Sequence, residues 1–239
     1  YLKAGQTGTA TSGTMTVTGS PVSLVGGLNT ITTTGAIGNF TVTLPDIISK
    51  DLNAHSCTVT GATWGSQGRT FDGIDDYIDY GQPAPLLITG DHTIIAWVKP
   101  ASFTNGGLIL GQLAANGYTG VYLLIIAPTT GYLSYYRGNG ATAEVNVSAS
   151  SALTLNEWNH IAISVSGVAV SFYITGNHQG TINHGAVTVA ASGTNLRTGY
   201  STYPNNPLNG IIGGLWVNNR ASLDTGIKDH KLKTEWRYQ

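Results

Sequence analysis

Short runs in which apolar and polar residues alternate dominate the chain, and glycine, proline or asparagine separates most of them. Alternation with a period of two puts every second side chain on the same face of a strand, so each run predicts a strand with one buried face. Phe40–Leu44 is one example. Leu108–Gly111 and Val121–Ala127 are continuous apolar runs, which suit strands covered on both faces. The pattern predicts an all-β protein.

Two glycine-containing pairs mark tight turns between such runs. In Gly68–Tyr80, which reads GRTFDGIDDYIDY, Asp72-Gly73 stands between β-forming residues. Both residues tolerate a positive φ at little steric cost, so the pair predicts a hairpin. Gly176-Asn177 predicts a second hairpin, which follows a strand at Val170–Thr175.

The alternation also predicts which side chains reach the core. Leu133 and Tyr135 should face inward, because neighbouring side chains in a strand point to opposite faces. Ser134 and Tyr136 then lie on the opposite face. In the same way His160, Ala162 and Ser164 share one face of a later strand, opposite Ile161, Ile163 and Val165. The last strands are expected at Val187–Ala190 and Ile211–Val217.

The pattern and composition of the sequence change twice along the chain. Residues 1–45 hold several short alternating runs, which can bury little by themselves, and are expected to form a small β-rich N-terminal segment. Residues 46–222 are long enough to form the main sandwich with a sizeable core. Residues 223–239 are a locally basic tail.

The basic tail is expected to contain a short helix. Leu223, Ile227 and Trp236 can anchor it, and Ser222 or Asp224 can cap its first turn. The tail and residues 1–45 are candidate packing surfaces for a homo-oligomer or a larger assembly.

Five segments together resemble the laminin-G-like, or concanavalin A-like lectin/glucanase, jelly-roll family. They are Gly68–Tyr80, Thr93–Pro100, Asn156–Gly167, Val170–Asn177 and Leu208–Ala221, and they occur in the family's order over roughly residues 66–222. The resemblance implies a two-sheet antiparallel jelly-roll sandwich in which Trp97 is a core residue. Members of the family serve many purposes, so the fold alone does not fix the function.

Composition and charge exclude several classes of partner and site. The net charge is -1 and only 10% of the residues are charged, which gives no electrostatic case for nucleic acid or an acidic membrane surface. Cys57 is the only cysteine, so neither an intrachain disulfide nor a cysteine-based zinc site can form. No apolar run is long enough to span a bilayer. Because the chain begins at Tyr1, we expect a processed form or a piece of a longer protein.

Four aspartates near the Asp72-Gly73 turn are candidate metal ligands. Asp72, Asp75, Asp76 and Asp79 offer carboxylate oxygens, which hard cations such as calcium prefer. The resemblance implies a structural calcium in many members, for which Asp72 and Asp76 are the candidate ligands here. The chain departs from the family pattern at Gly210–Leu215, where two acidic residues are absent. The alternative is that Asp72 bonds backbone amides in the turn and the other carboxylates are solvated. No cofactor is expected to be required.

Catalytic motifs are missing from the sequence. Retaining glucanases of this fold need two carboxylates about 5 Å apart, commonly on a glutamate-rich strand. The chain's glutamates are Glu144, Glu157 and Glu235, and none lies in such a motif. There is no G-x-S-x-G elbow and no H-E-x-x-H pair. The protein is therefore expected not to be an enzyme.

Two groups of tyrosine and polar residues are candidate ligand-binding loops. Aromatic rings stack on the C–H faces of sugars, while amide and guanidinium groups bond the hydroxyls. The candidate residues are Tyr118, Tyr136, Arg137, Asn139, Tyr200, Tyr203 and Asn205. Exposed tyrosines also cover the rims of β-sandwiches without binding anything, and this alternative stays open.

The sequence favours a non-catalytic binding or adhesion module that recognises a glycan or a glycosylated surface. Such a module would belong to a larger extracellular, cell-surface or virion protein. Two alternatives remain: a structural protein that decorates a filament, capsid or tail, and a glycoside hydrolase or lyase.

Overall fold

The computed structural model describes residues 13–14, 40–41, 56–113, 119–142, 144–200 and 206–238. The chain divides into two compact units, Tyr1–Ser56 and Cys57–Gln239. In the first unit, β1 (Gly13–Thr14) pairs in parallel with β2 (Phe40–Thr41). The other strands predicted within residues 1–45 lie outside the described residues. No helix in the described ranges has the length and apolar character needed to cross a membrane.

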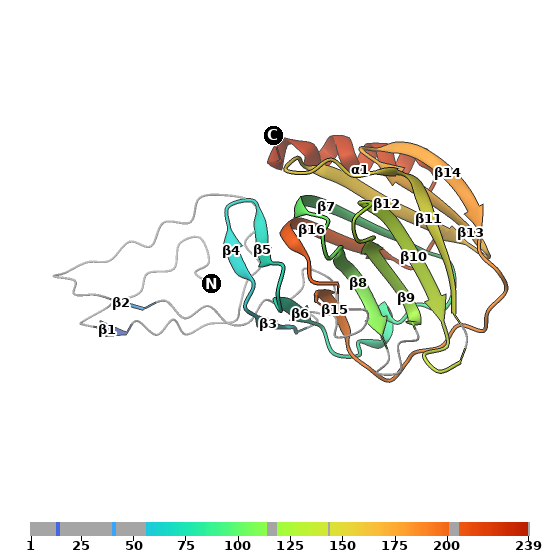
Figure 1. Ribbon diagram of the computed structural model, residues 1–239, viewed down its shortest axis with the longest axis horizontal. Helices are drawn as coiled ribbons and strands as arrows, with labels where there is room; N and C mark the ends of the chain where they lie inside the picture. The colour runs from blue at the N-terminus through green and yellow to red at the C-terminus, as the bar shows by residue number, and fades with distance from the viewer. Residues whose placement is uncertain are drawn as a thin grey trace, which may run out of the picture. The chain divides into compact units, whose positions relative to one another are not determined.

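The second unit is a sandwich of two seven-stranded antiparallel sheets, which confirms the predicted jelly-roll class (Figure 1). The β11–β3 sheet contains, in spatial order, β11 (Glu144–Ala152), β10 (Tyr132–Gly138), β9 (Thr119–Ile126), β8 (Gly107–Leu113), β15 (Leu196–Gly199), β6 (Tyr77–Asp79) and β3 (Thr58–Thr60). The β14–β4 sheet contains β14 (Asn177–Asn183), β13 (Ala169–Ile174), β12 (Asn159–Ser166), β7 (His92–Ser102), β16 (Asn209–Asn218), β5 (Gly68–Asp72) and β4 (Thr63–Gly65). A 3-10 turn, η1 (Ala84–Leu86), precedes β7.

The predicted hairpin over Gly68–Tyr80 is wrong, because its two strands belong to different sheets. β5 pairs with β4 and β16, whereas β6 pairs with β3 and β15. The Asp72-Gly73 pair does mark a tight turn, in which Gly73 has a φ of +80°. The turn carries the chain from one sheet to the other, since each strand finds its partners elsewhere. A turn signal fixes the local bend but not the pairing of the strands around it.

The last strand of the β11–β3 sheet also differs from the prediction. Val187–Ala190 forms no strand, and β15 lies further along the chain. Leu196 and Thr198 are buried at 0% and 1% exposure, so this segment fills the space between β8 and β6. The hairpin at Gly176-Asn177 is confirmed by the antiparallel pairing of β13 with β14.

The core between the sheets is built on inward-facing residues of β7, β9 and β10. Leu133 and Tyr135 are 0% and 1% exposed, as the alternation predicts. His92 links the two sheets: its Nδ1 donates to the Gly90 carbonyl, and its Nε2 accepts from the Tyr135 hydroxyl at 2.9 Å. Tyr122 lies beside the same imidazole, with ring centroids 5.2 Å apart.

The central part of the outer face of the β14–β4 sheet is covered by α1 (Asp224–Thr234), which is followed by η2 (Glu235–Arg237) (Figure 1). Register places Trp216, Ile95, Ala162 and Tyr173 in one row across β16, β7, β12 and β13. Ile227 of α1 packs on this row and is fully buried. The predicted helix and the predicted anchor Ile227 are therefore confirmed.

Other details of the predicted tail are wrong. Leu223 and Trp236 are 80% and 67% exposed and do not anchor the helix. Neither predicted cap forms, because both side chains bond the sandwich instead. The Ser222 hydroxyl accepts from Thr93, and the Asp224 carboxylate accepts from the Tyr173 hydroxyl.

Replacing Ile227 by alanine should lower the free energy of unfolding by about 2–5 kcal/mol, the usual cost of truncating a buried isoleucine. Leu232→Ala is the matched control, since Leu232 lies on the same helix but is 62% exposed. The control should change the free energy by less than about 0.5 kcal/mol. Denaturant titration measures both, and equal effects would contradict the packing of α1 on the sheet.

Candidate functional site

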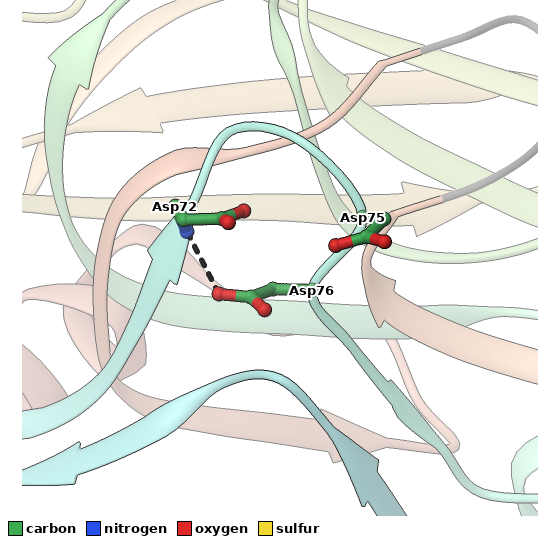
Figure 2. Close-up of side chains that lie close together, drawn as sticks. All are labelled: Asp72, Asp75 and Asp76. Atoms are coloured by element: carbon green, nitrogen blue, oxygen red, sulfur yellow. Dashed lines mark hydrogen bonds between the residues drawn. The ribbon is translucent and has the colours of Figure 1, made fainter.

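The turn between β5 and β6 gathers three carboxylates, from Asp72, Asp75 and Asp76 (Figure 2). Each residue offers one oxygen, and the three oxygens lie within 4.8 Å of one another. Asp72 Oδ1 accepts from the Ile74 amide at 2.8 Å, which is the turn-forming role predicted as the alternative to metal binding. Asp76 Oδ2 accepts from the Asp72 amide, also at 2.8 Å. The Asp75 carboxylate takes part in neither bond.

Asp76 is the most enclosed of the three, at 8% exposure. Its Oδ1 lies where a side chain at residue 61 would be, so Gly61, with a φ of +71°, leaves the space that it needs. Burial raises the pKa of Asp76, and the charges of Asp72 and Asp75 act in the same direction, whereas the bond from the Asp72 amide opposes them. A cation among these oxygens would remove the mutual repulsion.

The donor set fits a hard cation such as calcium. Carboxylate oxygens are the ligands that calcium prefers, and their close approach without a counter-charge is costly. Asp72, Asp75 and Asp76 are the residues that would hold it. Asp79 lies apart from them: it accepts from Arg197 at 2.9 Å and from Asn195 at 3.1 Å. Burial would raise the Asp79 pKa, but these bonds and the bond from Gly81 outweigh it and lower the pKa.

The same carboxylates are poorly placed for glycoside hydrolysis. Asp72 and Asp76 each use an oxygen to hold the turn. Of the glutamates, Glu144 accepts from the Thr119 amide and Glu235 pairs with Lys231. Glu157 is exposed in the turn before β12.

Tyr136 lies half-buried on the outward face of β10 and packs against an apolar cluster of Leu108, Leu123 and Ile125. Its direct neighbour across the strand pair is Asn146, which is exposed. Burial and the negative charge of Glu144 raise the pKa of Tyr136, so its hydroxyl stays a neutral donor at physiological pH.

A pair of serines continues this outward face. Ser134 and Ser148 lie opposite each other on β10 and β11, and their hydroxyl oxygens are 2.7 Å apart. We call the surface formed by Tyr136, Asn146 and Ser148 the β10–β11 face; Ser134 shares its side of the sheet but is buried, at 4% exposure. The face combines an aromatic ring with an amide and one exposed hydroxyl. Sequence reasoning missed Asn146 and Ser148, although their alternation with Val147 and Ala149 signals an outward row.

Arg137, another candidate ligand-binding residue, is not part of the β10–β11 face. Adjacent side chains in a strand point to opposite faces, and Arg137 points inward with 4% exposure. Its guanidinium donates to the carbonyl oxygens of Thr89 and Gly90. This contact ties β10 to the segment before β7.

Of the remaining candidate ligand-binding residues, the structure describes Asn139 and Tyr200. Asn139 Oδ1 accepts from the amides of Ala141 and Thr142, and so shapes the turn between β10 and β11. Tyr200 follows β15 and is half-buried. Tyr118, Tyr203 and Asn205 lie outside the described residues.

An exposed aromatic side chain also occurs on the edge strand β4. Trp64 is 69% exposed, and the Arg69 guanidinium lies 5.0 Å from the centre of its ring.

The family model of the concanavalin A-like lectin/glucanases superfamily matches residues 71–228. No curated protein sequence matches the chain significantly.

Solved structures share the fold at low sequence identity. Domain 4 of AbnA, a GH43 extracellular arabinanase from Geobacillus stearothermophilus, solved with arabinotriose, is 17% identical with a TM-score of 0.62, covering 81% of this chain and 93% of that chain. The heptameric SAP-like pentraxin of Limulus polyphemus is 17% identical with a TM-score of 0.51, covering 70% and 82%. The binding domain of botulinum neurotoxin serotype D is 13% identical with a TM-score of 0.57, covering 77% of this chain and 48% of that chain.

Proposed function

Because the chain belongs to the concanavalin A-like lectin/glucanases superfamily, we propose that it is a non-catalytic module that binds a glycan or a glycosylated surface. The module would be part of an extracellular or surface-displayed protein. Domains with the same fold support this proposal, since one was solved with arabinotriose and another is a toxin's binding domain.

The observation that carries the proposal is the β10–β11 face. The half-buried ring of Tyr136 is held by neighbouring apolar side chains on the same face of the sheet, so stacking a sugar on it orders little new structure. Asn146 and Ser148 lie on the neighbouring strand, where an amide and a hydroxyl can bond sugar hydroxyls. Tyr118, Tyr200, Tyr203 and Asn205 remain candidates for a wider site, and Arg137 and Asn139 would support it from behind the face and from the turn.

Calcium at the Asp72–Asp76 turn is part of the proposal as a structural ion. It would stabilise the crossing between the two sheets rather than touch the ligand. No other cofactor is required for binding.

A second candidate function is assembly into a filament, capsid or tail. The observation that favours it is the exposure of Leu232 and Trp236, at 62% and 67%, at the C-terminal end. Light scattering of the whole chain separates the candidates, because an assembly protein must associate with further copies or with a scaffold. A chain that stays monomeric and binds a glycan would contradict the assembly function.

Replacing Tyr136 by alanine should weaken glycan binding at least tenfold, about 1.4 kcal/mol, because the stacking platform is lost. Asn146→Ala should weaken it less, since other groups can still bond the sugar. Trp64→Ala is the control, because it removes an exposed aromatic from the other sheet. Retention on a glycan array reports all three variants. Unchanged binding by the Tyr136 variant, with loss in the Trp64 variant, would move the site to β4.

Calcium should raise the melting temperature. Saturation at a hundredfold excess over Kd stabilises by about 2.7 kcal/mol, roughly 5–10 °C for a domain of this size. Asp75→Asn should abolish the rise without disturbing the turn, because Asp75 holds neither turn bond. Asp229→Asn, an exposed change on α1, should keep it. A melting temperature that chelator leaves unchanged in the unmodified protein refutes calcium binding.

A further inference from the structure

Two histidines meet between the β14–β4 sheet and the helix that covers it. His160 lies on the outward face of β12, directly opposite Trp97 of β7, and is fully buried. His230 of α1 lies above it, and His160 Nε2 is 3.0 Å from His230 Nδ1. Each histidine ring packs at a steep angle against a tryptophan: the centroids of Trp97 and His160 are 5.1 Å apart, and those of Trp216 and His230 are 4.4 Å apart.

The outer nitrogens of this pair have no partners. His160 Nδ1 and His230 Nε2 are buried and make no hydrogen bond. In the neutral pair, one proton forms the bond between the rings and the second sits on one outer nitrogen. A third proton would leave both outer nitrogens as buried N–H groups without acceptors. A fourth proton would place an N–H group on both facing nitrogens, His160 Nε2 and His230 Nδ1, so the hydrogen bond between the two rings would be lost.

The charged residues nearby do not stabilise the positive charge of a protonated His160 or His230. Lys231 adds positive charge near His160 and is paired with Glu235 of η2. Asp224, at the start of α1, already accepts from the Tyr173 hydroxyl. The other titratable groups along this interface are Tyr238, which stacks on Trp97, and His178 of β14, which lies beside Tyr173. Among the described residues no carboxylate bonds either imidazole.

The protonation behaviour follows from this enclosure. Burial lowers the pKa of His160 to about 3, and the charges of His230 and Lys231 act in the same direction. Burial also lowers the pKa of His230. Released histidines would have a pKa near 6.5. The docked state is therefore favoured fully above about pH 6.5, and it loses stability as the pH falls toward the docked pKa values.

Helix α1 is the part of the fold that protonation of these histidines can displace most easily. Ile227 is the only buried residue of α1, whereas β12 beneath it is buried on both faces. Two polar contacts assist docking: Trp97 Nε1 donates to Thr234 Oγ1 at 2.8 Å, and the Tyr173 hydroxyl donates to Asp224 at 2.6 Å. All these contacts are local, so α1 and η2 can leave without breaking a strand pairing.

We propose that His160 and His230 form an acid-sensitive latch: the neutral pair holds α1 on the sheet, and protonation releases α1 and η2. Release would uncover an aromatic surface of Trp97, Trp158, Trp216 and Tyr173. The device is independent of glycan binding, because the β10–β11 face lies on the other sheet.

Amide hydrogen exchange of the unmodified protein tests the latch. Below about pH 6.5 the protection of α1 amides, corrected for intrinsic exchange, should fall up to tenfold per pH unit for each histidine that is protonated on release. Amides of β7 and β12 should keep more protection than α1 at each pH. Burial lowers the pKa of His92, in the core, to about 4, so acid also weakens the sandwich, but that effect reaches all strands together.

Variants and a second measurement separate the latch from general acid unfolding. His160→Gln with His230→Gln should remove most of the pH dependence of α1 protection, while His178→Gln, an exposed histidine nearby, should retain it. Since the double variant can dock poorly, NMR titration of the unmodified protein follows both imidazoles directly. Coincident titration and loss of α1 protection support the latch. Constant α1 protection down to pH 4.5, or loss in step with β12, overturns it.

Discussion

Burial of strand β7 on both of its faces is the constraint on which the rest of the fold depends. On the inner face, His92 bonds Tyr135 of the opposite sheet. On the outer face, Ile95 packs on Ile227 and Trp97 bonds Thr234. Because β7 carries apolar side chains on both faces, the C-terminal helix stabilises the sandwich as a third layer that covers the outer face of this strand.

The same requirement explains an unusual stretch of β16. Gly213 lies where the Tyr238 ring packs, and a side chain there would collide with that ring. Tyr238 in turn stacks on Trp97 at 4.7 Å. Gly213, which lies in the stretch where acidic residues of the family pattern are absent, therefore serves the packing of the C-terminal segment in this chain.

Much of this architecture could be predicted from local pattern, and the errors have a common cause. The alternation of β12 correctly placed His160, Ala162 and Ser164 on one face, because alternation is a property of the strand alone. The pairing partners of β5 and β6, and the position of β15, depend instead on strands that are far away in the sequence. The caps of α1 failed for the same reason, since Ser222 and Asp224 found stronger partners on the sheet.

The candidate sites also differ in how far they could be predicted from the sequence. The carboxylate cluster could be found from sequence, because its members are neighbours in the chain. The β10–β11 face could be found only in part: Tyr136 was identified, whereas Asn146 and Ser148 come from the next strand and meet it through register. Arg137 is adjacent to Tyr136 in sequence but is buried on the other side of the sheet, as the alternation of β10 requires.

The central claim of our proposal is that the β10–β11 face binds a sugar and leaves it chemically unchanged. A glycan-array screen of the whole chain, run with and without calcium and followed by product analysis of the retained sugars, examines both halves of that statement. We expect a defined subset of glycans to be retained and recovered intact. Retention of none, or recovery of shortened oligosaccharides, would contradict it.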